Sequence, residues 1–287
     1  MKLSVIIPCF NAASTIAVQL EALANQHWSK PWEVIVSDNG STDETVAIVE
    51  QYKEKLPNLR VVDSSGRRGA AHARNVGALA AASEALAFCD ADDEVAPGWV
   101  AAMGEALSNY DFVACKREYN KLNEAWTLKY RELSQIDGLQ EYTYPPYLIH
   151  ASSSTLGVRR SVHEAVGGFD ETLLRLQDTD YCWRIQLAGT KLHFVPEAVV
   201  HYRFRDTIKD IYHQSRLWGE YNVLLYKKYR PLGMPEVSWK TSVKAWVRLL
   251  KRFPKVLFKE HRAKWVSDFA RRVGRLQGCI KYRVLAL

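Results

Sequence analysis

The sequence predicts an α/β fold in which a parallel sheet carries helices on both faces and a basic helical region follows it. Short β-branched runs alternate with segments of helical periodicity in the first third of the chain. Polar, turn-forming residues follow three of these runs. The charge also divides the chain: residues 1–200 hold 18 Lys+Arg against 26 Asp+Glu, a balance of −8, whereas residues 201–287 hold 21 against 6, a balance of +15.

Apolar spacing and caps predict the elements from the N-terminus onward. The run at 3–7 ends in Pro8 and is typical of a buried strand, and Ser14 is a suitable N-cap for the helix that follows. Beyond Trp99 the pattern is less regular, with a variable stretch at 118–146. Strands are predicted at 3–7, 32–36, 59–63, 85–89, 112–115 and 198–200, and helices at 15–26, 44–55, 71–82, 161–166, 178–188 and, with basic faces, after Arg205.

The composition excludes several classes of protein. With 47% hydrophobic and 25% charged residues among 287, the chain is neither collagenous nor wholly disordered. Its five cysteines are scattered without a Cys-x-x-Cys pair, which excludes a disulfide framework and a zinc knuckle and favours a reducing compartment. The apolar opening is shorter than a signal-peptide core, and no stretch reaches the ~18 uncharged residues of a membrane span. We therefore expect a cytoplasmic protein.

Polar side chains follow three predicted strands, at 8–11, 38–43 and 90–93. Because ligands of open α/β sheets lie beyond the carboxyl ends of the strands, we expect these residues to share one crevice. Asp90 and Asp92 are hard oxygen ligands that suit Mg²⁺ or Mn²⁺ together with substrate phosphates. Taken alone, Asp-x-Asp is equally typical of a solvated turn or a helix cap, since Asp favours both.

Five ordered blocks within residues 1–203 resemble the family-2 glycosyltransferases. They are Val5-Ile6-Ile7-Pro8-Cys9-Phe10-Asn11, the run from Val34 to Asp43, Gly69 to Gly77 with Ala73-Arg74-Asn75, Asp90-Ala91-Asp92-Asp93, and Gly167-Gly168-Phe169-Asp170-Glu171 followed by Gln177-Asp178-Thr179-Asp180. The resemblance implies a non-processive bacterial-type enzyme with a GT-A (Rossmann-like) fold. It also implies a nucleotide-diphosphate sugar donor, a divalent metal (Mn²⁺ or Mg²⁺) and inversion at the anomeric carbon.

The resemblance also assigns donor-side roles to particular residues. Pro8, Phe10 and Asn11 lie beside the donor nucleotide, and Asp38 with Asn39 lies beside a uracil or thymine base. Many relatives have two aspartates at the latter positions, so here Asp38 would accept the base N–H while Asn39 donates or accepts elsewhere.

The diphosphate and the metal have their own predicted ligands. Arg74 would make a charge-assisted contact to the diphosphate, although an Arg at the start of an Ala-rich helix is also typical of a solvated face. Asp90 is implied to contact both the donor and the metal, Asp92 to bind the metal, and His201, at the end of the last predicted strand, to reach the metal or the phosphates. The alternative for His201 is an ordinary hydrogen-bonded histidine.

The predicted general base is Asp178, which occupies the second acidic position of a family Glu-Asp pair. The first position here is Gln177, which can orient a neighbour by hydrogen bonding but cannot share a proton with it. The alternative is that Asp178 and Asp180 only begin a helix, where carboxylates favour the positive end of the dipole. His150 is a weaker candidate for the acceptor pocket.

The predicted domains follow the charge. Residues 1–205 form the catalytic domain, with 1–95 on the donor side and 96–205 on the acceptor side, and residues 206–287 form a basic helical region. Stripes at Val243, Trp246, Val247 and Leu250 and at Trp265, Phe269, Val273, Leu276 and Ile280 lie among cations such as Lys251, Arg252, Arg271 and Arg272. Such helices either lie on an anionic membrane, here the inner face of the cytoplasmic membrane, or pack on the protein.

These observations favour a metal-dependent inverting glycosyltransferase of the hexosyltransferase type. It would use a UDP- or dTDP-sugar and a hydroxyl of a glycan or lipid-linked acceptor, and it would serve polysaccharide biosynthesis. Nucleic acid is not an expected partner, because no recognition motif accompanies the basic charge. The alternatives are a sugar-nucleotide-forming nucleotidyltransferase and a non-catalytic sugar-nucleotide-binding protein. Whether the chain forms a homo-oligomer is left open.

Overall fold

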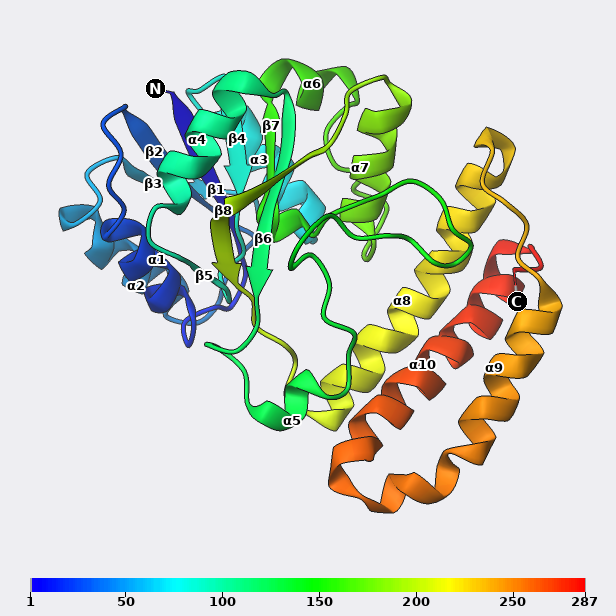
Figure 1. The fold of residues 1–287 in the computed structure, drawn as a ribbon. Coiled ribbons are helices and arrows are strands. Elements are labelled where there is room, and N and C mark those ends of the chain that lie inside the picture. Colours follow the sequence, from blue (N-terminus) through cyan, green and yellow to red (C-terminus); the bar gives the residue numbers. More distant parts are fainter. Residues whose placement is uncertain (1, 287) are drawn as a thin grey trace. The chain divides into compact units, whose positions relative to one another are not determined.

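The computed structural model describes residues 2–286, which divide into two compact units (Figure 1). The first unit comprises the chain up to Leu122 together with Ser134–Gln140 and His150–Arg203. The second comprises Asn123–Leu133, Glu141–Ile149 and the chain from Phe204 onward. Two short segments within the predicted catalytic domain thus belong to the second unit.

The first unit is built on an eight-stranded sheet of order β3-β2-β1-β4-β7-β6-β8-β5. Strands β3, β2, β1 and β4 are parallel, as are β6 and β8, whereas β7 is antiparallel to β4 and β6 and β5 is antiparallel to β8. The strands are β1 (Leu3–Cys9), β2 (Trp32–Asp38), β3 (Leu59–Asp63), β4 (Ala85–Phe88), β5 (Glu94–Val95), β6 (Phe112–Glu118), β7 (Leu156–Arg159) and β8 (His193–His201). The parallel arrangement predicted from the first four strands is confirmed, whereas the antiparallel strands β7 and β5 were not predicted, because apolar spacing carries no information on strand direction.

Helices cover both faces of this sheet, and the alternation of side chains along the strands explains why. Val5 and Ile7 join one buried core with α1, α2 and α4, whereas Ile6 joins the other with α3 and α7. The helices of this unit are α1 (Ile16–Ala24), α2 (Thr45–Gln51) with the 3₁₀ turn η1 (Tyr52–Glu54), α3 (Ala70–Ala80), α4 (Trp99–Asn109), η2 (Ser153–Thr155), α6 (Arg160–Ala165) and α7 (Gln177–Leu187) (Figure 1).

Helix α4 was not predicted, although Trp99, Met103 and Leu107 lie on its buried side. Gly104 in its middle weakens the helical pattern and costs about 1 kcal/mol relative to Ala. A Cβ at Gly104 would lie 2.3 Å from the Trp28 ring, so the close approach of that ring requires the glycine. A tertiary contact therefore outweighs the local preference.

The second unit is helical. It contains α5 (Ala125–Leu128), α8 (Ile208–Tyr229), η3 (Arg230–Leu232), α9 (Trp239–Lys251), η4 (Phe253–Leu257) and α10 (Lys259–Tyr282). Helices α8 and α10 approach so closely that a Cβ at Gly219 would lie 2.0 Å from the Arg271 carbonyl oxygen. The hydroxyls of Ser215 and Ser267 meet across the same contact at 2.8 Å. Within residues 2–286, no helix is long and apolar enough to cross a membrane.

Of the two alternatives left open for the stripe at 265–280, packing on the protein is the one that its first half follows. The buried face of α10 consists of small residues: Ala263, Ser267, Ala270, Gly274 and Gly278. Trp265 and Phe269 stack on each other with centroids 5.2 Å apart, and Trp246 of α9 meets Phe269 edge-on. The stripe containing Trp265 and Phe269 therefore packs within the unit rather than remaining exposed. Its far end, at Ile280, is 81% exposed.

The same packing corrects the predicted cationic face of α10. Burial lowers the pKa of Arg271 to about 10, and its guanidinium lies 5.7 Å from the Trp218 ring. Arg275 lies 3.4 Å from the Tyr144 ring, and burial lowers its pKa as well. The guanidinium groups of both arginines thus lie against aromatic rings inside the unit, so they do not form a free basic surface.

Candidate functional site

The parallel strands β1, β2 and β4 end at one edge of the sheet, which places Asn11, Asp38 and Asp90 at the edge beyond which such sheets form their ligand crevice. Asn11 has a φ of 48° and its side chain accepts from the Thr42 main-chain N–H at 2.8 Å. Its own N–H donates to the Ser41 hydroxyl at 2.9 Å. The segments after β1 and β2 are thus joined, and Asp38 supports the second by accepting from the Ser41 hydroxyl at 2.5 Å.

Asn39, predicted as a donor contact, is buried and satisfied by the protein itself. Its amide nitrogen donates to the carbonyls of Ser64 at 2.5 Å and Arg67 at 2.8 Å, and its oxygen accepts from the Gly69 N–H at 2.8 Å. Both amide hydrogens of Asn39 are therefore donated within the protein, so the side chain has no hydrogen left to donate to a ligand. Its role is to position the loop before α3.

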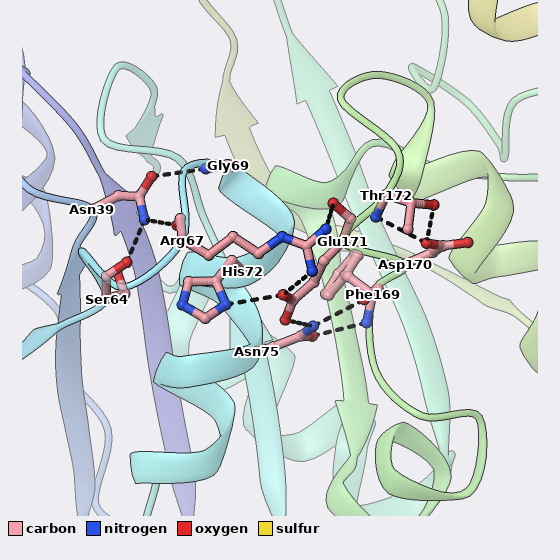
Figure 2. Close-up of polar contacts among 10 residues, drawn as sticks. All are labelled: Asn39, Ser64, Arg67, Gly69, His72, Asn75, Phe169, Asp170, Glu171 and Thr172. Carbon is pink, nitrogen blue, oxygen red and sulfur yellow. Dashed lines mark hydrogen bonds and ion pairs between the residues drawn. The ribbon is translucent and has the colours of Figure 1, made fainter.

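Figure 2 shows a polar network that continues from this loop to the segment before α7. Glu171 accepts from Asn75 at 2.9 Å and from Arg67 at 3.2 Å, and it lies 3.0 Å from the His72 Nδ1. Asn75 also donates to the Phe169 carbonyl at 2.9 Å and accepts from its N–H at 2.8 Å. Burial opposes ionisation here, yet hydrogen bonds from Asn75 and His72 keep the pKa of Glu171 below its ordinary value.

The individual contacts of this network were not predicted from the sequence. The sequence indicated only that both segments belong to blocks that resemble the family. The pattern gave no pairing between the stretch 69–77 and the stretch 167–171, which are distant in sequence. The structure shows that Asn75 and Glu171 fasten the segment before α7 onto α3. The two blocks are therefore held together in the fold although they are distant in sequence.

Arg74 is the most buried cation of the crevice, at 2% exposure. Its guanidinium donates to the Asp90 carboxylate at 2.5 Å and lies 5.6 Å from the Phe169 ring. With the Gln177 amide oriented to satisfy its neighbours, its oxygen accepts from Arg74 Nη1 at 2.8 Å and its nitrogen donates to the Leu173 carbonyl at 2.9 Å. One buried cation therefore connects Asp90, after β4, with the first residue of α7.

Asp178 is the second residue of α7, adjacent to this connection. One carboxylate oxygen accepts from the Thr179 N–H at 2.8 Å, as expected at a helix N-terminus. Burial lowers the pKa of His150 to about 4, against the opposing effect of the Asp178 charge. His150 is thus neutral at pH 7 and lies near enough to Asp178 for the carboxylate to act on it. Asp180 is fully buried and bound by Arg184 at 2.7 Å, which marks it as structural.

The acidic turn after β4 is anchored by Arg203, two residues beyond the end of β8. The Arg203 N–H donates to Asp93 Oδ1, and its Nε donates to the Asp92 carbonyl, both at 2.9 Å. Burial, with the charges of Asp92 and Asp90, raises the pKa of Asp93 well above its ordinary value. Within the described residues, Asp93 Oδ2 is buried and has no hydrogen-bond partner. Burial and the neighbouring carboxylates thus disfavour the charged form of Asp93, so the negative charge of this turn rests on Asp90 and Asp92.

His201 is held by Glu118, whose carboxylate lies 2.7 Å from the His201 Nδ1. Residues 2–286 contain no group of three or more His, Cys, Asp or Glu side chains placed to hold a metal. The predicted set of Asp90, Asp92 and His201 is therefore not assembled as a three-ligand site. The hard carboxylates of Asp90 and Asp92 still fit Mg²⁺ or Mn²⁺ when substrate phosphates complete the shell.

Three residues at the end of β1 complete the crevice. Pro8 is half-buried in the strand, and Cys9 beside it is buried, where desolvation and the charges of Asp38, Asp43 and Asp92 raise the pKa of its thiol to about 12. That thiol is inert as a nucleophile or ligand. The Phe10 ring is 44% exposed, with the Arg68 guanidinium 4.4 Å from its centroid. A cavity of about 440 Å³, lined by Trp28, Trp32 and Asn58 among others, lies at the start of β2, away from these strand ends.

The family model of glycosyl transferase family 2 matches residues 4–167 of this chain. The model of glycosyl transferase family group 2 matches residues 87–259. The uncharacterized glycosyltransferase YibD of Escherichia coli is 37% identical over 44% of this chain and 37% of its own length. The pre-mycofactocin glycosyltransferase of Mycobacterium tuberculosis is 26% identical over 85% of this chain and 52% of its own length. The chain therefore spans about half or less of these two relatives.

Solved structures share the fold at low identity. TarS of Staphylococcus aureus (residues 1–349), in complex with UDP-GlcNAc, aligns over 99% of this chain and 93% of its own with a TM-score of 0.58 and 20% identity. The mannosyltransferase PcManGT of Pyrobaculum calidifontis, in complex with GDP-Man and Mn²⁺, aligns over 96% of this chain and 87% of its own with a TM-score of 0.61 and 19% identity. The predicted GT-A fold with C-terminal helices is confirmed by these likenesses.

Proposed function

Because this chain belongs to glycosyl transferase family 2, we propose that it transfers a hexose from a UDP- or dTDP-sugar to a hydroxyl of a glycan or lipid-linked acceptor, with inversion at the anomeric carbon. The observation that carries this proposal is the position of Arg74, bound to Asp90 on the donor side and to Gln177 beside Asp178. A leaving diphosphate needs positive charge, and an attacking hydroxyl needs a base that accepts its proton. The arrangement offers a cation, Arg74, and a carboxylate, Asp178, around one crevice.

The chemistry assigns a proton transfer to Asp178. Its carboxylate takes the proton of the acceptor hydroxyl as that oxygen attacks the anomeric carbon, and the bond from that carbon to the diphosphate oxygen breaks. Attack from the side opposite the leaving group inverts the configuration. Neutral His150 beside Asp178 adds no positive charge that would hold the carboxylate in an ion pair.

On the donor side, the proposed nucleotide contacts are Asp38, Asn11, Pro8 and the exposed Phe10 ring. Asp38 accepts hydrogen bonds from its own loop and has carboxylate lone pairs left to accept an N–H of a pyrimidine. The Phe10 ring offers a flat surface for a base, and Arg68 over it reinforces the stack with positive charge. Asn39 supports the loop and is not among the contacts.

Arg74, Asp90 and Asp92 are the proposed diphosphate side of the site. Arg74 is buried and fixed in direction, so its guanidinium meets a diphosphate without first being ordered. Asp90 and Asp92 would hold Mg²⁺ or Mn²⁺, which as a Lewis acid neutralises the charge that develops on the leaving diphosphate. The nucleotidyltransferase alternative is set aside by the family match.

A donor and acceptor panel tests this function. We expect hexose transfer from a UDP- or dTDP-sugar, loss of turnover in a chelator, recovery with Mn²⁺ or Mg²⁺, and loss of turnover in Asp92→Ala. The product should have the anomeric configuration opposite to that of the donor, as read by NMR. Retained configuration would contradict the inverting mechanism, and full turnover in metal-free protein would contradict the metal.

A further inference from the structure

Helix α9, the turn η4 and Phe258 after it carry a series of exposed large apolar side chains. Trp239 is 62% exposed, Leu250 65% and Leu257 82%. Soluble surfaces carry single residues of this kind, but a contiguous row marks a contact surface. The row, here called the α9 stripe, consists of Trp239, Val243, Val247, Leu250, Phe253, Leu257 and Phe258.

Along α9 itself the stripe is distinct from the side by which the helix packs in its own unit, whereas Phe253 of η4 also meets the Trp265 ring edge-on at 5.5 Å. Leu249 is buried and its carbonyl accepts from the Trp265 indole N–H at 3.0 Å, and Trp246 meets Phe269. With about 100° between successive residues, Trp239, Val243, Val247 and Leu250 fall within an arc of about 80° beside that packed side. Figure 1 shows α9 lying alongside α10 with its outer side uncovered within this unit.

Positive charge flanks the stripe without opposition. Residues 237–258 contain six Lys and Arg and no Asp or Glu. All six are exposed: Lys240, Lys244, Arg248, Lys251, Arg252 and Lys255. Four of them, Lys240, Lys244, Arg248 and Lys251, lie on α9, on the arc next to the stripe, so one side of the helix is apolar and its neighbour is cationic. An ordinary solvated face mixes the two signs, and this one does not.

We propose that the α9 stripe docks on an anionic lipid surface. The apolar row enters the boundary between headgroups and acyl chains, Trp239 lies at the interface, and the flanking lysines and arginines meet the negative headgroups. This inference is independent of the proposed catalysis, because it rests on residues of the second unit alone. A lipid-linked acceptor would then be reached from a surface to which the protein already binds.

A second copy of the chain is the main competing occupant, and the charge argues against it. In a two-fold dimer the same patch faces itself, so the unopposed cations of one copy would lie against those of the other. An anionic membrane presents the complementary sign over the whole length of the patch. Charge complementarity thus selects the lipid surface.

Sedimentation of the full chain with vesicles tests the proposal. The probes are vesicles of phosphatidylcholine alone and of an equimolar mixture with phosphatidylglycerol, at low and high salt. We expect binding to the anionic vesicles at low salt, weakening with added salt, and little binding to the neutral vesicles. Leu250→Asn/Leu257→Asn and Lys244→Glu/Lys251→Glu/Lys255→Glu should each weaken binding by roughly tenfold or more.

Matched controls carry the same chemical changes elsewhere on the surface. Leu79→Asn/Leu187→Asn alters two exposed leucines, and Lys2→Glu/Lys191→Glu/Lys209→Glu alters three exposed lysines. Both should bind vesicles like the unmodified chain, and the stripe variants should keep their circular dichroism and their donor turnover in solution. The proposal is overturned if the unmodified chain ignores anionic vesicles, if the lysine control loses binding equally, or if the unmodified chain is a dimer that the stripe variants render monomeric.

Discussion

Gln177 shows how one side chain can set the charge of the crevice. Its neutral amide faces Arg74, which leaves the full positive charge of that guanidinium to Asp90 and, under the proposed function, to the diphosphate of the donor. The usual family residue at this position is a glutamate, which would compete for Arg74. The glutamine at position 177 could be recognised from the sequence, but its contact with Arg74 could be seen only in the structure.

Replacing Gln177 by Glu therefore tests a positioning role. The added carboxylate should draw Arg74 away from the diphosphate, and its negative charge should repel the diphosphate. We therefore expect the KM for the donor to rise by about tenfold while kcat changes less. Gln186→Glu adds the same charge nine positions along α7 and serves as the control. Equal KM values in the two variants would show that Gln177 does not act through Arg74.

His163 gives the protein a pH-dependent stability outside the crevice. Burial, with the charges of Arg160 and Arg184, lowers its pKa to about 4, and its Nδ1 lies 2.7 Å from the Tyr181 hydroxyl. The unfolded chain binds the proton near pH 6.5 and the folded chain only near pH 4, so the free energy of unfolding is unaffected by this group above pH 6.5 and falls as the pH drops from about 6.5 to 4. The contribution is on the order of 3 kcal/mol.

Urea unfolding of His163→Gln between pH 7 and pH 5 measures this effect. The amide can still meet the Tyr181 hydroxyl but does not titrate, so the free energy of unfolding should fall less with pH than in the unmodified protein. His213→Gln, at an exposed position of α8, should keep the full pH dependence. Parallel curves for the unmodified protein and His163→Gln would refute the assignment.

At the scale of the element, α10 explains why periodicity misleads. Hydrophobic spacing selected the face with Trp265 and Phe269, yet the closest helix contact uses the small residues around Gly274. Small residues have little hydrophobic signal but allow backbones to approach. The arginines beside them, Arg271 and Arg275, consequently lie inside the unit although the sequence placed such residues on a free polar face.

Substituting Gly219 by Ala should therefore destabilise the helical unit. In an exposed helix this change would stabilise by about 1 kcal/mol, but here the new Cβ would meet the Arg271 carbonyl oxygen at 2.0 Å. Because that oxygen belongs to backbone, the helices must separate, at a net cost of roughly 2 kcal/mol or more. Thermal unfolding should show a lower Tm than for Gly66→Ala, where no atom lies within 4 Å of the new Cβ. An unchanged Tm would contradict the close packing.

For the whole molecule, the alternation of strands and helices predicted the half of the sheet that holds β1 to β4, and with it the edge where Asp38 and Asp90 lie. It could not predict β7 and β5, because their partners are distant in sequence and their direction is not encoded in spacing. The same limit applies to the site: Asp90 and Arg74 could be named from the sequence, but their ion pair and the fastening of Glu171 to Asn75 depend on the folded chain.

The charge division of the sequence has a related outcome. Residues 1–200, the acidic part, form the crevice. In the basic part, residues 201–287, arginines of α10 such as Arg271 pack inside the helical unit, whereas the cations of α9 lie at the surface. A sum over the sequence cannot separate these uses. Exposure of each side chain in the fold does separate them.

The most direct test of the central claim measures donor binding and sugar transfer in Asp178→Asn. If Asp178 removes the acceptor proton, calorimetry should give a donor Kd close to that of the unmodified enzyme, while transfer falls by at least the ~10²-fold typical of losing a general base. Asp111→Asn, an exposed carboxylate in the same unit, should change neither quantity. Retained transfer with weakened donor binding would contradict the account and assign Asp178 to the structure of the N-terminus of α7.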